Sequence, residues 1–357
     1  MKLSALFREA GRNIVTGTTR FALLGILSAV VFASLVLLDA LTTSGLVASA
    51  ERFRSSGAAT EILVAEGRVD GAACEALAGV PGVTASGALR SSARKITIAT
   101  LPDAPVPAHE VSPGFSAVVS DRAGSPSGVL LPRELADMIR AGLGDEVATD
   151  AGPMRVAEVF DYPSDGRRPG FGYAILSVGS ALGSYDECWA TAWPQLPNLR
   201  TLLLATMSPS AGDGADKPQI MQLNSSQGAS FEGNASFTDR LTRAAAPAAA
   251  VIAAGIGFAG VRMRRLQHTS ALHAGLRKGD LLALGLLEAG GWAAAAGVIG
   301  VGAAAVGASM VERGDQFAVF ASLVGIPLAG VAGALIGTAV AAAAMSEKHL
   351  FRYFKDR

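Results

Sequence analysis

Four long apolar stretches constrain the fold of this chain more than any other feature of its sequence. The first begins at Phe21 and reads FALLGILSAVVFASLVLLDAL. At a helical rise of about 1.5 Å per residue, it is long enough to cross a hydrocarbon core of ~30 Å. We therefore expect an α-helical membrane protein with four transmembrane helices, at residues 21–42, 243–261, 281–309 and 317–345.

The composition agrees with this expectation, because 50% of the residues are apolar, 17% are charged and the mean hydropathy is +0.38. A cleaved signal peptide is the alternative for the first stretch, since the small residues at 47–50 resemble a cleavage site. The apolar run, however, exceeds the ~7–15 residues of a signal-peptide core, and a long basic leader precedes it. These features favour a retained helix.

Charges are distributed unevenly, although the formal net charge is zero. Basic residues exceed acidic ones in three segments, at 1–20, 262–280 and 346–357. Residues 44–240 hold 15 basic and 22 acidic residues, and the loop at 310–316 is nearly neutral. Basic loops stay on the cytoplasmic side of a membrane. We therefore expect a multi-pass protein of the plasma membrane, with both termini and the 262–280 loop in the cytoplasm and the 310–316 loop outside.

Residues 43–242 have a different character, with short β-like runs separated by Gly, Pro, Asp and Ser clusters. This pattern predicts a mixed α/β extracytoplasmic domain inserted between the first and second spans. We expect strands at 60–65, 94–101, 154–160 and 172–177, helices at 70–77 and 132–141, and a loop at 205–238. Asp70 is the expected N-cap of the first of these helices.

The chain has two cysteines, Cys74 and Cys188, and both fall in this domain. A structural disulfide is one interpretation, because an extracytoplasmic compartment permits oxidation. Two buried free thiols that pack as small hydrophobes are the other. The spacing of the two residues does not decide between them.

Small and charged residues inside the spans are the candidates for helix packing. Gly333 and Gly337 form a GxxxG pair, which lets two helix backbones approach closely. The competing interpretation is an alanine-rich composition that places small residues everywhere. Glu288 and Asp39 lie inside spans, where a charge is a functional candidate. Both are near a span end, so a packing or anchoring role competes with that interpretation.

Motifs for catalysis are absent from the sequence. It has no GxxxxGK[ST], HExxH, GxSxG or CxxC pattern, and the four histidines are scattered over different segments. We therefore expect no enzymatic activity, no cofactor, no metal and no nucleic-acid partner in this chain.

The segment between the second and third spans resembles that of FtsX/MacB-type ABC transporter permeases, whose pattern is RRxE(I/L)xxLRALGxxRxxLxxLxLxE. The matching residues are Arg264-Arg265-Leu266, the run ALHAGLRKGDLL at 271–282, and Glu288. Two positions depart from the pattern, because Gln267 or His268 replaces the acid and ALHAG stands for LRALG. The order of one span, an external domain and three spans is also similar to that family.

A second resemblance lies in the external domain. MacB-type domains contain a helix, a Gly-Asp turn and a pair of strands. Similar phrases here are GVLLPRELA at 128–136, GLGDEV at 142–147 and MRVAEVF at 154–160.

The resemblance implies that two copies of the chain, as a homodimer, bind two cytoplasmic ATPase subunits that carry ATP and Mg. Residues 262–280 would be the coupling helix, with Leu272, Leu276 and Gly279 on the face offered to the ATPase. The implied contact residues are Arg264, Arg265, Leu272, Gly275, Leu276, Arg277, Lys278 and Gly279. A basic segment that only sets topology and binds anionic membrane lipids is the alternative.

The implied activity is mechanical transmission, in which ATP hydrolysis drives export or extraction of an amphipathic substrate such as a peptide, drug or lipid-linked compound. The alternative is a non-transport signal transmitter that activates a cell-wall hydrolase or a sensor kinase.

Overall fold

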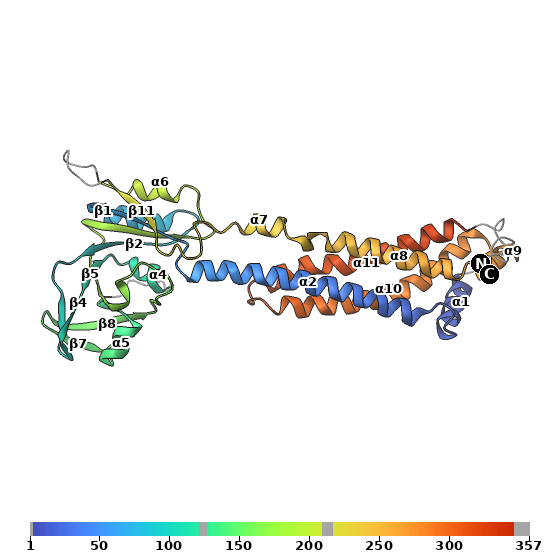
Figure 1. The fold of residues 1–357 in the computed structure, drawn as a ribbon, viewed down its shortest axis with the longest axis horizontal. Helices are drawn as coiled ribbons and strands as arrows, with labels where there is room; N and C mark the ends of the chain where they lie inside the picture. The colour runs from blue at the N-terminus through green and yellow to red at the C-terminus, as the bar shows by residue number, and fades with distance from the viewer. Residues whose placement is uncertain (1–2, 121–126, 209–216, 346–357) are drawn as a thin grey trace. The chain divides into compact units, whose positions relative to one another are not determined.

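The computed structural model describes residues 3–120, 127–208 and 217–345 (Figure 1). The chain divides into two compact units. We call residues 1–49 and 233–357 the helical unit, and residues 50–232 the sheet domain. The sheet domain is thus inserted into the helical unit, as the hydropathy pattern predicts.

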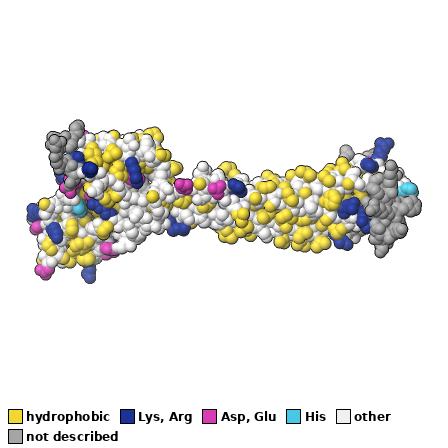
Figure 2. All heavy atoms as spheres, turned by 45° about the horizontal axis from the view of Figure 1, so that its top comes forward, with side chains coloured by type: hydrophobic (Ala, Val, Ile, Leu, Met, Phe, Trp, Pro, Cys, Tyr) yellow, Lys and Arg dark blue, Asp and Glu magenta, His cyan; other side chains and the backbone are white. Residues whose placement is uncertain are grey.

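Among the residues that the structure describes, four helices are long and apolar enough to cross a membrane: Phe21–Ser55, Leu241–Met263, Lys278–Ala308 and Gln316–Ala343. The elements of the helical unit are α1 (Leu3–Val15), α2 (Phe21–Ser55), α7 (Gly233–Thr238), the 3-10 turn η3 (Leu241–Ala244), α8 (Ala245–Met263), α9 (Arg265–His273), α10 (Lys278–Ala308) and α11 (Gln316–Ala343). Hydrophobic side chains cover much of this unit between its ends, and Lys and Arg gather near the end that carries α1 and α9 (Figure 2).

Helix α2 is longer than the sequence predicts, because it runs to Ser55 instead of ending near residue 42. Residues 43–55 contain no proline, and Ala48, Ala50, Glu51, Arg52 and Arg54 favour helix once a helix has begun. Hydropathy marks only the part of a helix that lipid can cover. The last turn of α2 lies beyond that part and belongs to the sheet domain.

The sheet domain is built on one mixed sheet with the order β11-β1-β10-β2-β5-β9-β6-β8-β7-β3-β4. Its strands are β1 (Thr60–Asp70), β2 (Val83–Ser91), β3 (Ile96–Ile98), β4 (Leu101–Val106), β5 (Ala108–Val111), β6 (Val129–Pro132), β7 (Glu146–Thr149), β8 (Gly152–Phe160), β9 (Ile175–Val178), β10 (Ser184–Ala192) and β11 (Gln219–Gln222). The helices are α3 (Gly71–Ala76), α4 (Phe115–Ser120), α5 (Arg133–Ile139) and α6 (Leu199–Leu204), with 3-10 turns η1 (Leu77–Gly79) and η2 (Phe171–Tyr173). The pairs β5–β9 and β6–β8 are parallel, and the other pairs are antiparallel.

Strong local signals in this domain are reproduced. Asp70 caps α3, since its Oδ1 accepts hydrogen bonds from the backbone N–H groups of Ala72 and Ala73 at 2.9 and 3.1 Å. The helix at 132–141 corresponds to α5, and the strand at 154–160 to β8.

Three expectations for this domain are wrong. A single strand at 94–101 is replaced by the hairpin of β3 and β4, because Ala99 and Thr100 form a turn. The strand at 172–177 begins only at Ile175, after η2. The segment 205–238 is not wholly loop, since it includes β11 and α7, while residues 209–216 lie outside the described part.

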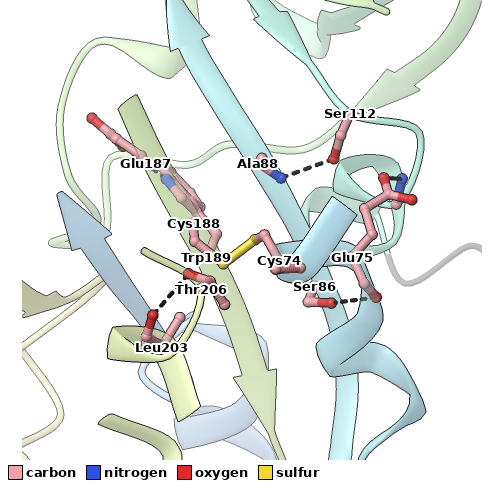
Figure 3. Close-up of a disulfide and its surroundings, with 12 residues drawn as sticks. Cys74, Glu75, Ser86, Ala88, Ser112, Glu187, Cys188, Trp189, Leu203 and Thr206 are labelled. Atoms are coloured by element: carbon pink, nitrogen blue, oxygen red, sulfur yellow. Dashed lines mark hydrogen bonds between the residues drawn. A yellow bond between two sulfur atoms is a disulfide. The ribbon is translucent and has the colours of Figure 1, made fainter. Parts of the chain in front are cut away.

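Cys74 of α3 and Cys188 of β10 form a disulfide, and both side chains are fully buried (Figure 3). The pairing joins residues 114 positions apart in the sequence. It lies in a cluster with Leu63, Ala88 and Leu203, so the bond ties the short helix α3 to strand β10 of the sheet.

We expect the double substitution Cys74→Ala with Cys188→Ala to lower the free energy of unfolding of the sheet domain by about 2–5 kcal/mol, because the unfolded chain loses a long covalent loop. The measurement is urea unfolding of the full chain in nanodiscs, followed by tryptophan fluorescence. Wild-type protein treated with reductant is the matched control and should unfold at a similarly lowered midpoint. An unchanged midpoint in both samples would show that the bond does not constrain the domain.

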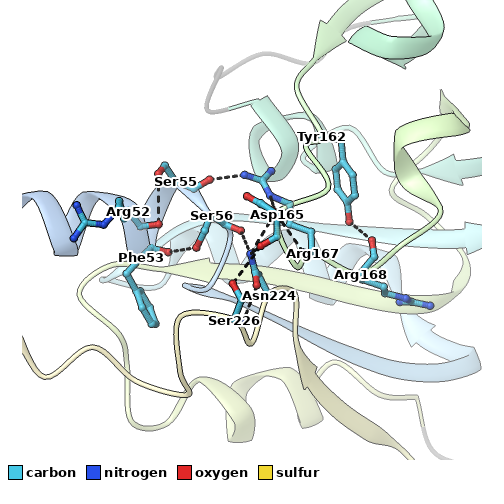
Figure 4. Close-up of polar contacts among 10 residues, drawn as sticks. All are labelled: Arg52, Phe53, Ser55, Ser56, Tyr162, Asp165, Arg167, Arg168, Asn224 and Ser226. Atoms are coloured by element: carbon cyan, nitrogen blue, oxygen red, sulfur yellow. Dashed lines mark hydrogen bonds and ion pairs between the residues drawn. The ribbon is translucent and has the colours of Figure 1, made fainter.

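Aromatic and polar contacts hold the last turn of α2 in the sheet domain, and Figure 4 shows the polar ones. Phe53 packs against Trp193 and Phe231, with ring centroids 6.1 and 5.9 Å away. Arg167 donates from Nη2 to the carbonyl of Ser55 at 2.5 Å. Nearby, the Asn224 amide donates to the carbonyl of Ser56 at 3.0 Å. These bonds satisfy carbonyl groups that a helix leaves free at its C-terminus.

Candidate coupling site

The predicted coupling segment 262–280 folds as a short helix between two turns. Helix α8 ends at Met263, α9 covers Arg265–His273, and α10 begins at Lys278. Gly275 follows α9 with a φ of +94°, a left-handed conformation that favours glycine. The N–H of Leu276 bonds to the carbonyl of Ala271, and the N–H of Gly275 bonds to that of Leu272. This pair of bonds is a Schellman motif, which gives α9 a sharp end.

The face that we expected α9 to offer to a partner is partly wrong. Leu272 is only 3% exposed, and it packs with Val261, Leu281 and Ala341. Leu276 is half-buried against the same cluster. These leucines hold α9 on the neighbouring helices because a short helix needs an apolar anchor. The exposed residues of the segment are Met263, Gln267, Ser270, His273, Ala274, Gly275, Arg277, Lys278 and Gly279.

Glu288 of α10 lies at the centre of a polar cluster near α9. Its Oε2 is 2.5 Å from Nη1 of Arg264, and its Oε1 accepts a hydrogen bond from Nδ2 of Asn13 at 2.8 Å. Glu288 is 6% exposed, and the Arg264 side chain is also largely buried. A buried carboxylate of this kind is tolerated because both oxygens have partners. One side chain therefore joins α1, the α8–α9 junction and α10.

Arg265, the second arginine of the predicted pair, is the first residue of α9 and is half-buried. Its carbonyl accepts a hydrogen bond from the hydroxyl of the buried Thr269 at 2.8 Å. The two neighbouring arginines thus occupy different places, with Arg264 in the Glu288 cluster and Arg265 at the start of α9.

A cavity of about 30 Å³ adjoins this cluster. Its lining includes Thr19, Arg264, His268, Trp292 and Thr338. The volume is large enough for a water molecule. Among the described residues, no group bonds to the buried Oγ1 of Thr19, which lies in this lining. The lining thus combines polar groups with the ring of Trp292.

His268 of α9 is neutral at physiological pH. Burial lowers the pKa of its ring to about 4, and the positive charge of Arg264 lowers that pKa further in the same direction. A neutral imidazole beside Arg264 leaves Glu288 as the carboxylate that balances the arginine.

The glycine pair lies where α8 and α11 cross. A Cβ atom on Gly333 would be 2.1 Å from the carbonyl oxygen of Ala250, and one on Gly337 would be 1.9 Å from that of Ala254. These distances leave no room for any side chain. The close approach holds α8, which leads directly into Arg264 and α9, against the last helix of the unit.

Two partners in the helical unit were not found by reasoning from the sequence. Asn13 has no local signal that would connect it to Glu288, 275 positions away. Asp39 of α2 pairs with Arg240 at 3.0 Å, and both side chains are largely buried. The signal for this pair was present, because Asp39 is a lone acid in an apolar span and Arg240 directly precedes another.

Comparisons with known proteins give a structural neighbour for part of the chain. Neither protein-family models nor curated proteins match the chain. Among solved structures, the periplasmic region of MacB from Actinobacillus actinomycetemcomitans is similar to 48% of this chain, over 92% of its own length, with 14% identity and a TM-score of 0.35. A likeness at this level establishes neither a family nor a function.

Proposed function

We propose that this chain is the membrane permease subunit of an ABC transporter and that it couples ATP hydrolysis by a partner ATPase to export or extraction of an amphipathic substrate. The observation that carries the proposal is the tie between α9 and the spans. Arg264, at the start of α9, pairs with Glu288 of α10 inside the helical unit. A force applied to α9 would thus reach two long helices directly.

The exposed surface of the segment supports binding of a protein partner. Arg277 and Lys278 are exposed next to the ordered turn at Gly275, whereas Leu272 anchors α9 inward. Because α9 is anchored, the basic turn that follows it has a defined position. Such a turn can bind a groove that is lined by acidic residues in a partner. In this proposal the α9 end of the helical unit and both chain termini are cytoplasmic, and the sheet domain is extracytoplasmic.

Movement of short helices at an interface is a known way to transmit conformational change. Closure of a nucleotide-bound ATPase pair would displace α9, and α8 and α10 would move with it. A homodimer of this chain would place two such segments opposite two ATPases. The substrate would be handled by the sheet domain, outside the cytoplasm.

The test is co-expression with an ABC ATPase encoded beside this chain, followed by purification in nanodiscs. We expect the double substitution Arg277→Glu with Lys278→Glu to reduce the amount of co-purified ATPase about tenfold or more, because like charges then face each other across the interface. Gly275→Pro should uncouple hydrolysis, since proline has neither the left-handed φ nor the N–H that bonds to Leu272.

Arg313→Glu is the matched control, because Arg313 is an exposed arginine in the loop between α10 and α11, away from α9. It should leave assembly unchanged. The coupling proposal fails if no ATPase co-purifies with the wild type, or if the double substitution and the control behave alike. If assembly and coupling hold but no amphipathic substrate leaves proteoliposomes, the signalling alternative is favoured.

A further inference from the structure

Helix α1 has three adjacent stripes of residues at helical spacing. The first, Leu6, Ala10 and Asn13, faces inward, with Leu6 and Ala10 buried. The next is apolar, with Phe7, Gly11 and Ile14, and the third contains Arg8, Arg12 and Val15. The three stripes therefore differ in chemistry around one short helix.

The inward stripe reaches the candidate coupling site. Helix α1 packs against α10, and Asn13 donates to Oε1 of Glu288 while Arg264 occupies Oε2. The same carboxylate thus binds α1 and the start of α9. Any movement of α1 along α10 would change how Glu288 holds Arg264.

The other two stripes are available to an external surface. Phe7 is 61% exposed and Val15 is 87% exposed. Arg8 and Arg12 are also exposed, and the acid on α1 is Glu9, which forms an exposed pair with Arg12 at 2.7 Å. Exposed pairs of this type are weak, so a more strongly negative surface can replace Glu9 as the partner of Arg12. An apolar stripe beside an arginine stripe is typical of a helix that lies in a lipid headgroup layer.

The position of α1 in the chain points to the same partner. Val15 ends α1 only six residues before Phe21, where the apolar helix α2 begins. A helix that ends so close to a span lies at the membrane boundary. Charge and apolar surface together therefore favour an anionic lipid surface over a soluble partner.

We propose that α1 senses anionic lipid, with Phe7, Arg8 and Arg12 contacting the lipid and Asn13 passing its position to Glu288. The inference rests on the membrane placement in the proposed function, and extends it to a lipid-dependent control of the coupling site.

The first experiment locates α1 relative to lipid. The full chain is spin-labelled at Gly11→Cys, where a side chain meets nothing within 4 Å, in nanodiscs of phosphatidylcholine alone or with one quarter phosphatidylglycerol. Accessibility to oxygen and to a nickel chelate reports depth. We expect the Gly11 label to enter the headgroup layer when phosphatidylglycerol is present. Labels at Ile26→Cys in α2 and at Leu182→Cys in the sheet domain are the lipid and water references, since both side chains are exposed.

These references distinguish a failure of the proposed function from a failure of the lipid-sensing inference. If the Ile26 label is in water, the membrane placement fails and the proposed function fails with it. If Ile26 is in lipid while Gly11 stays in water in both lipid mixtures, only the lipid-sensing inference is overturned.

The second experiment tests the link to Glu288. Trp292 lines the cavity beside Glu288, so 5-fluorotryptophan labelling gives a fluorine NMR signal at the site, assigned with Trp292→Phe. We expect phosphatidylglycerol to shift this signal in the wild type, and the shift to be lost in Arg8→Gln with Arg12→Gln and in Asn13→Ala. Ser4→Ala, an exposed change on the same helix, should retain it. A signal that is the same in both lipids, or that responds equally in Asn13→Ala, overturns the proposal.

Discussion

Replacing Gly337 with leucine is expected to prevent α8 and α11 from packing. The new Cβ alone would lie 1.9 Å from the carbonyl oxygen of Ala254, which is backbone and cannot rotate away. We expect a loss of about 3 kcal/mol or more in the stability of the helical unit. The measurement is the temperature at which the full chain in nanodiscs loses its native size-exclusion peak, which should fall by at least about 6 °C.

Gly325→Leu is the matched control on the same helix, because a Cβ at Gly325 meets nothing within 4 Å. It should leave this temperature within about 2 °C of the wild type, since surface changes cost little. Equal losses of heat stability in the two variants would mean that any glycine-to-leucine change in α11 is destabilising. The close crossing with α8 would then not be the cause.

The second large effect is expected from Glu288→Leu. This change leaves Arg264 largely buried without its carboxylate, which costs about 3–5 kcal/mol for a broken buried pair. The double substitution Arg264→Met with Glu288→Leu removes both charges. It should recover most of the lost stability, because replacing a buried pair with apolar residues is often neutral. Heat stability of the full chain in nanodiscs again measures both.

The double variant also separates stability from coupling. It should fold, yet fail to stimulate hydrolysis by the co-expressed ATPase, because α9 has lost its tie to α10. Glu312→Leu, in the exposed loop after α10, is the control for loss of a carboxylate. A double variant that remains as unstable as Glu288→Leu would contradict the pairing, and one that couples normally would contradict its role.

Much of the architecture is readable from the sequence, because it depends on local signals. The four apolar helices and the inserted mixed sheet are confirmed in the structure. Asp70 at the start of α3 follows from side-chain chemistry within three residues. The end of α2 does not, because it is set by the docking of Phe53 on Trp193 and Phe231, which hydropathy does not report.

The candidate coupling site depends on tertiary contacts, so the sequence reveals only part of it. Arg264 and Glu288 stand out as charges beside or inside apolar stretches, but their pairing requires the turn of α9 between them. The sequence pattern predicts that Leu272 lies on an exposed contact face, but its side chain is buried. Helical spacing says which residues share a face, but the neighbours of the helix decide whether that face is covered. Similarly, Cys74 and Cys188 pair because the fold brings their Cα atoms within 5.8 Å.

The aromatic contact between Phe53 and Phe231 has a consequence for how such a chain can evolve. The two rings are 5.9 Å apart, yet one stands where the chain enters the sheet domain and the other where it leaves. A domain whose two ends meet can be inserted, exchanged or removed with little disturbance to its host. Residues 50–232 therefore form an exchangeable domain, and one helical scaffold can carry different domains of this kind for different tasks.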